Sequence, residues 1–149
     1  ASLPMMCAMN DQVGSEKERA IVPAPKKKRV MVVGGGLAGM SAARVAATKG
    51  HDVILYDKGA ELGGQTLIAS KAPLRGDLME AVRNLEKDLA RLSVPIELGT
   101  EVTEQMVLDQ NPDHVIVATA PSESSYPALA LILKVEAASP PAAAAPKAG

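Results

Sequence analysis

Hydrophobic residues are concentrated between about residues 29 and 119, where they form short continuous runs separated by more polar segments. The continuous runs lie at residues 30–33, 53–56, 94–98 and 114–118, and they are rich in Val, Ile and Leu. Runs of this length and composition are typical of parallel strands that are covered on both faces of a sheet. The chain is therefore expected to contain four buried strands.

The segments between these strands predict helices and loops. Residues 75–92 carry leucine or valine at spacings of four and three residues, which places these side chains on one face of a helix. Residues 37–49 are rich in small helix formers, and residues 104–110 are expected to form a short helix. Residues 58–74 contain several glycines and a proline and are predicted to be a loop, while residues 129–135 fit either a strand or a helical turn.

The alternation of strands and helices along the chain predicts an α/β fold with a Rossmann-like doubly wound parallel sheet. Residues 29–120 would form this domain. An N-terminal arm or linker at residues 1–28 would precede it, and an Ala/Pro-rich tail at residues 121–149 would follow it.

Composition and charge narrow the classes of function. The net charge is −1 and the chain has two Tyr but no Phe or Trp, so it lacks both a basic surface and stacking residues for nucleic acid. No apolar run approaches the length of a membrane helix, and no signal peptide opens the chain. A single cysteine excludes an internal disulfide framework. We therefore expect a cytoplasmic protein that binds neither nucleic acid nor membranes.

A glycine-rich segment directly follows the first predicted strand and opens the first predicted helix. It has the G-x-G-x-x-G pattern and consists of Gly34, Gly35, Gly36, Leu37, Ala38 and Gly39. In this context the pattern is typical of a dinucleotide-binding turn. Gly34 would permit the tight turn, Gly36 would let the backbone approach a pyrophosphate, and Gly39 would let the helix pack closely on the strand. A glycine turn that binds nothing is the alternative.

Asp57 and Lys58 follow the second predicted strand. A carboxylate at the end of this strand can accept hydrogen bonds from the hydroxyl groups of an adenosine ribose, and it would repel a 2′-phosphate. Asp57 is therefore a candidate ribose-binding residue with Lys58 beside it. The alternative is an ordinary acidic residue at the end of a strand.

A second glycine loop follows at the same predicted edge of the sheet, where ligands of α/β sheets bind, and it consists of Leu62, Gly63, Gly64 and Gln65. It is a candidate for contact with a phosphate or a flavin, and a flexible turn is the alternative. His51 and His114 stand apart from any cysteine or carboxylate cluster, and no nucleophile–base pair is recognisable. No catalytic side chain is assigned, so a cofactor would carry any chemistry.

The motifs at residues 26–120 resemble one family when they are taken together. RVMVVGGGLAGMSAA, DVILYDKGAELGGQ and NPDHVIVATA occur in this order. They resemble the FAD- or ADP-binding region of the old-yellow-enzyme-like iron–sulfur flavoprotein oxidoreductases. That group includes 2,4-dienoyl-CoA reductase, the NADH:flavin oxidoreductases and trimethylamine dehydrogenase.

The resemblance implies a set of cofactors and partners. Gly34, Gly36 and Gly39 would contact the pyrophosphate of FAD or ADP, Asp57 would bind the ribose, and Gly64 and Gln65 would lie near the cofactor. Cys7 resembles the last ligand of a 4Fe-4S cluster. The cluster, FMN on a TIM-barrel portion, and NAD(P)H as electron donor belong only to the intact enzyme.

Three departures from the family pattern limit these implications. A 4Fe-4S cluster takes four ligands, and this chain offers one cysteine. The family usually has glycine where this chain has Ala120, and residues 121–149 resemble no further part of the family. We therefore interpret the chain as a fragment, remnant or subunit that is inactive in isolation.

The expected function is the dinucleotide-binding portion of an NAD(P)H-dependent flavin oxidoreductase of the dienoyl-CoA or enoate reductase type. The alternative is a non-catalytic ADP-binding structural module, or an electron-transfer subunit of an amine-dehydrogenase-like complex.

Overall fold

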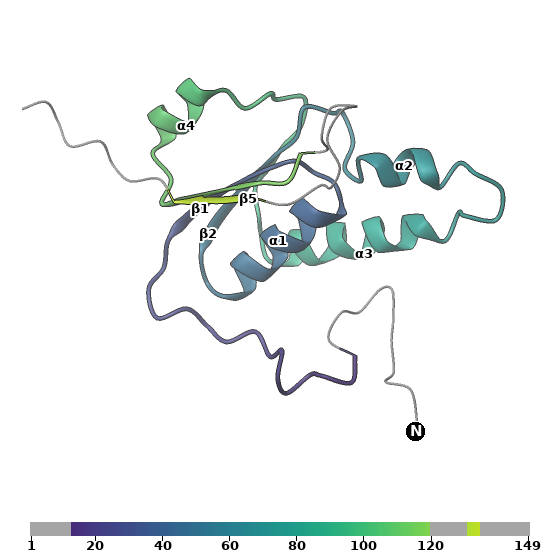
Figure 1. The fold of residues 1–149 in the computed structure, drawn as a ribbon, viewed down its shortest axis with the longest axis horizontal. Helices are drawn as coiled ribbons and strands as arrows, with labels where there is room; N and C mark the ends of the chain where they lie inside the picture. Colours follow the sequence, from purple (N-terminus) through teal and green to yellow (C-terminus); the bar gives the residue numbers. More distant parts are fainter. Residues whose placement is uncertain (1–12, 120–130, 135–149) are drawn as a thin grey trace, which may run out of the picture.

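The computed structural model describes residues 13–119 and 131–134, and a five-stranded sheet lies at the centre of this part of the chain (Figure 1). The strand order is β3-β2-β1-β4-β5. The strands are β1 (Arg29–Val33), β2 (Asp52–Tyr56), β3 (Ile96–Glu97), β4 (His114–Val117) and β5 (Leu131–Lys134). The first four strands run parallel, and β5 pairs antiparallel with β4 at one edge.

Helices cover both faces of the sheet. They are α1 (Leu37–Thr48), α2 (Gln65–Ala69), α3 (Leu78–Arg91) and α4 (Glu104–Gln110). In Figure 1, α1 and α3 lie together on one face of the sheet and α4 lies on the other. Right-handed crossovers explain this division: the chain steps in one direction from β1 through β2 to β3, and the return from β3 to β4 places α4 on the opposite face.

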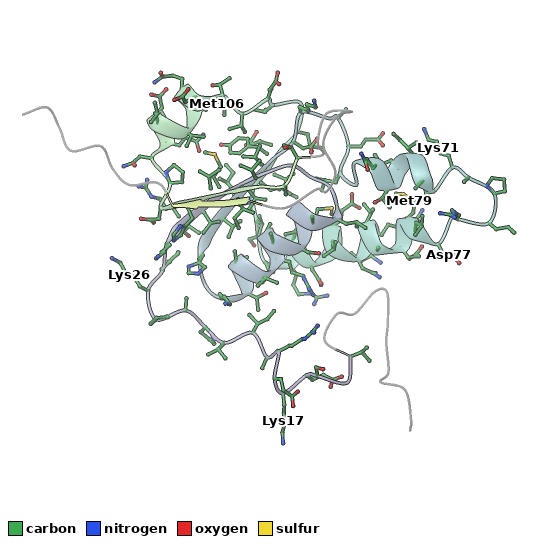
Figure 2. The ribbon with its side chains drawn as sticks, viewed as in Figure 1. Lys17, Lys26, Lys71, Asp77, Met79 and Met106 are labelled. Atoms are coloured by element: carbon green, nitrogen blue, oxygen red, sulfur yellow. The ribbon has the colours of Figure 1, made fainter. Side chains whose placement is uncertain are left out.

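Alternate residues of the strands contribute their side chains to two apolar clusters, one on each face of the sheet. On the face of α1 and α3, the buried side chains are those of Val30, Val32, Met40, Ala43, Ala46, Val53, Leu55, Leu62, Val82, Leu89 and Val94. On the other face, Met31, Tyr56 and Val115 are buried, and Met106 of α4 points toward them (Figure 2). The side chain of Met79, a residue of α3, lies on the side of α3 that faces α2 and packs against the larger cluster (Figure 2).

Hydrogen bonds from backbone and side-chain groups at the amino ends of the strands hold β1 beside β4. The Arg29 N–H donates to Asp113 Oδ2 at 2.7 Å, and the Asp113 N–H donates to the Arg29 carbonyl at 2.9 Å. The bond from Arg29 holds the pKa of the Asp113 carboxyl below its ordinary value. The Arg29 guanidinium also donates to the Asn111 carbonyl at 2.7 Å, just beyond the end of α4. The neighbouring strands β1 and β4 are therefore held together at their amino ends.

The predicted α/β fold and its four parallel strands are confirmed, and two local expectations need correction. The predicted loop at 58–74 contains α2, whose five residues are too few to show a helical period and include no buried side chain. The third strand is only two residues long, because Pro95 has no N–H for the ladder and Leu98 is exposed. Of the two alternatives left open for residues 129–135, the structure has a strand, β5, at Leu131–Lys134.

Candidate functional site

The carboxyl ends of β1, β2 and β4 lie next to one another at one edge of the sheet. The sheet reverses its direction of growth between β1 and β4, because β2 and β3 lie on one side of β1 and β4 lies on the other. Ligands of open α/β sheets bind in the crevice outside the carboxyl ends at such a switch point. The glycine turn after β1 lies at this point.

Gly34 and Gly39 are required by the packing of the turn itself. Gly34 has φ of 114°, and its N–H donates to the Tyr56 carbonyl at 2.8 Å. A Cβ on Gly34 would lie 2.6 Å from the Ala118 carbonyl oxygen, and a Cβ on Gly39 would overlap the Gly34 carbonyl oxygen. The absence of side chains at these two positions therefore lets α1 start directly against the ends of β1 and β4.

Gly36 differs from these two glycines because no atom of the described residues fills the space beside it. A Cβ built on Gly36 meets nothing within 4 Å. Its backbone, with φ of −73° and ψ of 176°, is extended and accessible to any residue. Within residues 13–119, neither packing nor backbone conformation requires glycine at this position. The open space over Gly36 is the feature expected where a ligand approaches the backbone.

The amino end of α1 presents backbone N–H groups that have no acceptor within the helix. The first bond of the helix runs from the Met40 N–H to the Gly36 carbonyl at 2.9 Å, so the N–H groups of Leu37 and Ala38 have no acceptor within the helix. Gly36, the N-cap residue, makes no side-chain cap bond, and the first turn contains no acidic residue. These donors and the positive end of the helix dipole favour an anion such as a phosphate.

Asp57 is held next to the glycine turn by two backbone donors. The Gly35 N–H donates to Asp57 Oδ2, and the Gly59 N–H donates to Asp57 Oδ1 at 2.6 Å. The Asp57 side chain is half-buried, whereas Lys58 is exposed. Each carboxylate oxygen keeps a further lone pair that can accept a hydrogen bond from a ligand hydroxyl.

The second glycine loop lies against the first. The Gly63 N–H donates to the Gly35 carbonyl at 2.8 Å, and Gly36 and Gly63 form an isolated parallel bridge. A Cβ on Gly64 would lie 3.3 Å from Gly36 Cα. Gly64 and Gln65 are exposed beside the open space. The two glycine segments, which lie far apart in the sequence, are therefore neighbours at the edge of the sheet.

Two residues shape this site in ways that the sequence did not predict. Leu62 is buried, and its Cδ2 lies 2.6 Å from the position of a Cβ on Gly35. The Leu62 side chain therefore packs directly against the turn at Gly35. Gly59 holds Asp57 through its N–H. The only signal for Gly59 in the sequence was a glycine two positions after the acidic residue.

Other residues singled out in the sequence lie elsewhere. Cys7 and Ala120 lie outside the described residues. Among the residues that the structure describes, no group of three or more His, Cys, Asp or Glu side chains could hold a metal ion. His114 lies at the amino edge of the sheet, where its Nε2 is 2.9 Å from Lys28 Nζ. In the same described segments, no helix is both long and apolar enough to cross a membrane.

Comparison with known proteins agrees with this geometry. Residues 29–122 match the family model of the FAD dependent oxidoreductases. The chain is 46% identical over 114 residues to a bilirubin reductase of Mediterraneibacter gnavus, covering 76% of this chain and 18% of the relative. It is 42% identical over 122 residues to an N,N-dimethylglycine/sarcosine dehydrogenase of Chromohalobacter salexigens, covering 78% of this chain and 17% of the relative.

Among solved structures, the chain is similar to 2-naphthoyl-CoA reductase in complex with 2-naphthoyl-CoA. The two share 39% identity with a TM-score of 0.73, over 78% of this chain and 18% of the reductase. The chain thus spans less than a fifth of the length of these relatives.

Proposed function

Because this chain belongs to the FAD dependent oxidoreductase family and corresponds to the FAD-binding region of enoate and dienoyl reductase-like flavoproteins, we propose that it binds the ADP half of FAD at the Gly34–Gly39 turn. The observation that carries this proposal is the contrast within the turn. Packing requires glycine at Gly34 and Gly39, whereas Gly36 faces open space at the amino end of a helix. A glycine that packing of the described residues does not require, at the start of a helix, fits a pyrophosphate that approaches the backbone.

Each residue of the site has a specific task in this proposal. The N–H groups of Leu37 and Ala38 donate to the pyrophosphate, which lies over Gly36. Asp57 accepts from the adenosine ribose, and Gly64 and Gln65 border the path toward the flavin. FAD, when bound, supplies the redox chemistry, while the chain supplies binding and orientation.

We further propose that the intact enzyme is an NAD(P)H-dependent reductase of the enoate or dienoyl-CoA type. The similarity to a bilirubin reductase and to 2-naphthoyl-CoA reductase supports this class. FMN on a barrel portion and a 4Fe-4S cluster would complete the electron path, with Cys7 as one of the cluster's four ligands. The chain supplies one cysteine, so the other ligands would come from the portion by which the relatives are longer.

A second candidate is a non-catalytic structural module that binds ADP alone, or an electron-transfer subunit of an amine-dehydrogenase-like complex. The similarity to an N,N-dimethylglycine/sarcosine dehydrogenase favours it. The two candidates differ in the nucleotide that the same turn holds, because only FAD carries a flavin.

Identification of the nucleotide that co-purifies with the chain tests both candidates. The purified protein is denatured, and the released nucleotide is identified by its absorbance and mass. We expect FAD, with the visible absorbance of a flavin. Release of ADP alone would favour the second candidate. Absence of any nucleotide, together with no binding of added FAD or ADP, would contradict both.

Replacement of Asp57 is expected to weaken ADP binding. Asp57→Ala removes an acceptor whose hydrogen bonds to a ligand contribute about 1.5–3 kcal/mol, so the dissociation constant should rise about 10- to 150-fold. Asp57→Asn keeps one acceptor oxygen and should have a smaller effect. Calorimetric titration with ADP measures both variants. Equal affinity of the wild type and Asp57→Ala would remove Asp57 from the site.

A further inference from the structure

Gly59 lies outside both glycine segments, yet its contacts converge on Asp57. Its N–H donates to Asp57 Oδ1 at 2.6 Å, while the Gly35 N–H donates to the other carboxylate oxygen. The carboxylate is therefore held between two backbone donors, one from the turn after β1 and one from the turn after β2. A free aspartate side chain would sample several rotamers, whereas this one has a fixed direction.

A third segment fastens the turn that contains Gly59. The Gly99 N–H donates to the Gly59 carbonyl at 2.9 Å, and the Thr100 N–H donates to the Asp57 carbonyl at 2.9 Å. Both donors come from the loop between β3 and α4. Backbone hydrogen bonds from the β3–α4 loop therefore hold the turn at residues 57–59. Within this turn, the Gly59 N–H donates to the Asp57 carboxylate.

A side chain at position 59 would displace the Asp57 carboxylate before it displaced any other group. A Cβ at this position would lie 2.9 Å from Asp57 Oδ1, and its next contact is the Glu61 carbonyl oxygen at an ordinary 3.5 Å. Gly59 is not among the glycines with positive φ, so alanine fits its backbone without strain. The atom that must move to admit a methyl group is therefore the carboxylate oxygen, the mobile end of a side chain.

We propose that Gly59 is a positioning residue that fixes the Asp57 carboxylate for an adenosine ribose with a free 2′-hydroxyl group. The proposal rests on the function proposed above and assigns to Gly59 the selectivity of that same site. Gly59 acts through Asp57 and does not itself touch the nucleotide. Glycine is required here so that the carboxylate can occupy the space that a Cβ would take.

The test compares ADP with 2′-deoxy-ADP, because their difference reports the ribose hydroxyl alone. The wild type should bind ADP about tenfold more tightly than 2′-deoxy-ADP, as expected for one hydrogen bond to a charged group. Gly59→Ala should reduce this ratio to about twofold or less, because the displaced carboxylate no longer meets the hydroxyl. Gly76→Ala is the matched control, since a Cβ on Gly76 meets nothing within 4 Å. It should keep the wild-type ratio.

A double variant shows whether Gly59 acts through Asp57. In the Asp57→Ala background, adding Gly59→Ala should leave the ratio unchanged, which an independent effect on the fold would not do. On the wild-type chain, the amide resonance of Gly59 should shift on ADP binding, and that of Gly76 should not; this measurement stands even if a variant fails to fold.

The outcomes separate this proposal from the function on which it rests. A wild type that binds neither nucleotide would overturn both. A wild type that prefers ADP, with the same preference in Gly59→Ala, would overturn the role of Gly59 alone. Loss of the preference in Gly76→Ala as well would also overturn it, because the effect would then not be specific to Gly59.

Discussion

Gly39→Ala is expected to destabilise the folded chain severely. The new methyl group would overlap the Gly34 carbonyl oxygen, a backbone atom that cannot rotate away as a side chain does. Relief requires α1 to move off the end of β1, which would open the cluster that contains Met40 and Leu55. Overpacking in a well-packed interior typically costs about 1–3 kcal/mol and more where backbone must shift, so we expect a loss of at least about 3 kcal/mol.

Urea unfolding followed by circular dichroism measures this loss. Gly36→Ala is the matched control, because it lies in the same turn and its Cβ meets nothing within 4 Å. Its free energy of unfolding should stay within about 1 kcal/mol of the wild type, the cost of exchanging glycine for alanine at the start of a helix. A stable Gly39→Ala variant would show that α1 does not pack against β1 as described.

Gly36→Val is expected to have the opposite profile, with binding lost and stability retained. The branched side chain would fill the space over the amino end of α1, where the pyrophosphate is proposed to lie. The nucleotide would then lose its bonds to the N–H groups of Leu37 and Ala38. Two hydrogen bonds to a charged group contribute about 3–6 kcal/mol together, so ADP affinity should fall at least about 100-fold.

Calorimetric titration with ADP and a urea unfolding curve, made on the same preparation, test this pair of expectations. The unfolding curve matters because it separates a blocked site from a disrupted fold. Unchanged ADP binding by folded Gly36→Val would place the pyrophosphate elsewhere. Loss of both binding and folding would contradict the open space that the structure places beside Gly36.

The main elements of the fold could be predicted from the sequence because their patterns are local. The leucine spacing of α3 marks its buried face, and Val82 and Leu89 on that face are fully buried. The runs that became β1 and β2 are apolar at successive positions because both faces of the sheet are covered: Met31 faces one cluster and Val32 the other. A pattern that a single element carries is visible in the sequence of that element.

The features that were not predicted depend on contacts between segments. The hydrogen bond from the Gly63 N–H to the Gly35 carbonyl brings the second glycine loop to the first, and no residue spacing reveals it. The Gly59 N–H donates to Asp57, and the Gly59 carbonyl accepts from the N–H of Gly99, a residue forty positions further along the chain. The sequence predicted which residue types would bind a nucleotide, while the supports that orient them emerged from the three-dimensional arrangement.

The central claim is that the turn after β1 holds the pyrophosphate of an adenine nucleotide. Backbone amide chemical shifts of the wild-type chain, followed during a titration with ADP, test it most directly because they report position as well as affinity. The largest shifts should fall on Gly36, Leu37 and Ala38, with smaller shifts at Gly59 and Gly64 beside them. Unchanged shifts at these residues under saturating ADP, or shifts confined to other parts of the chain, would contradict the claim.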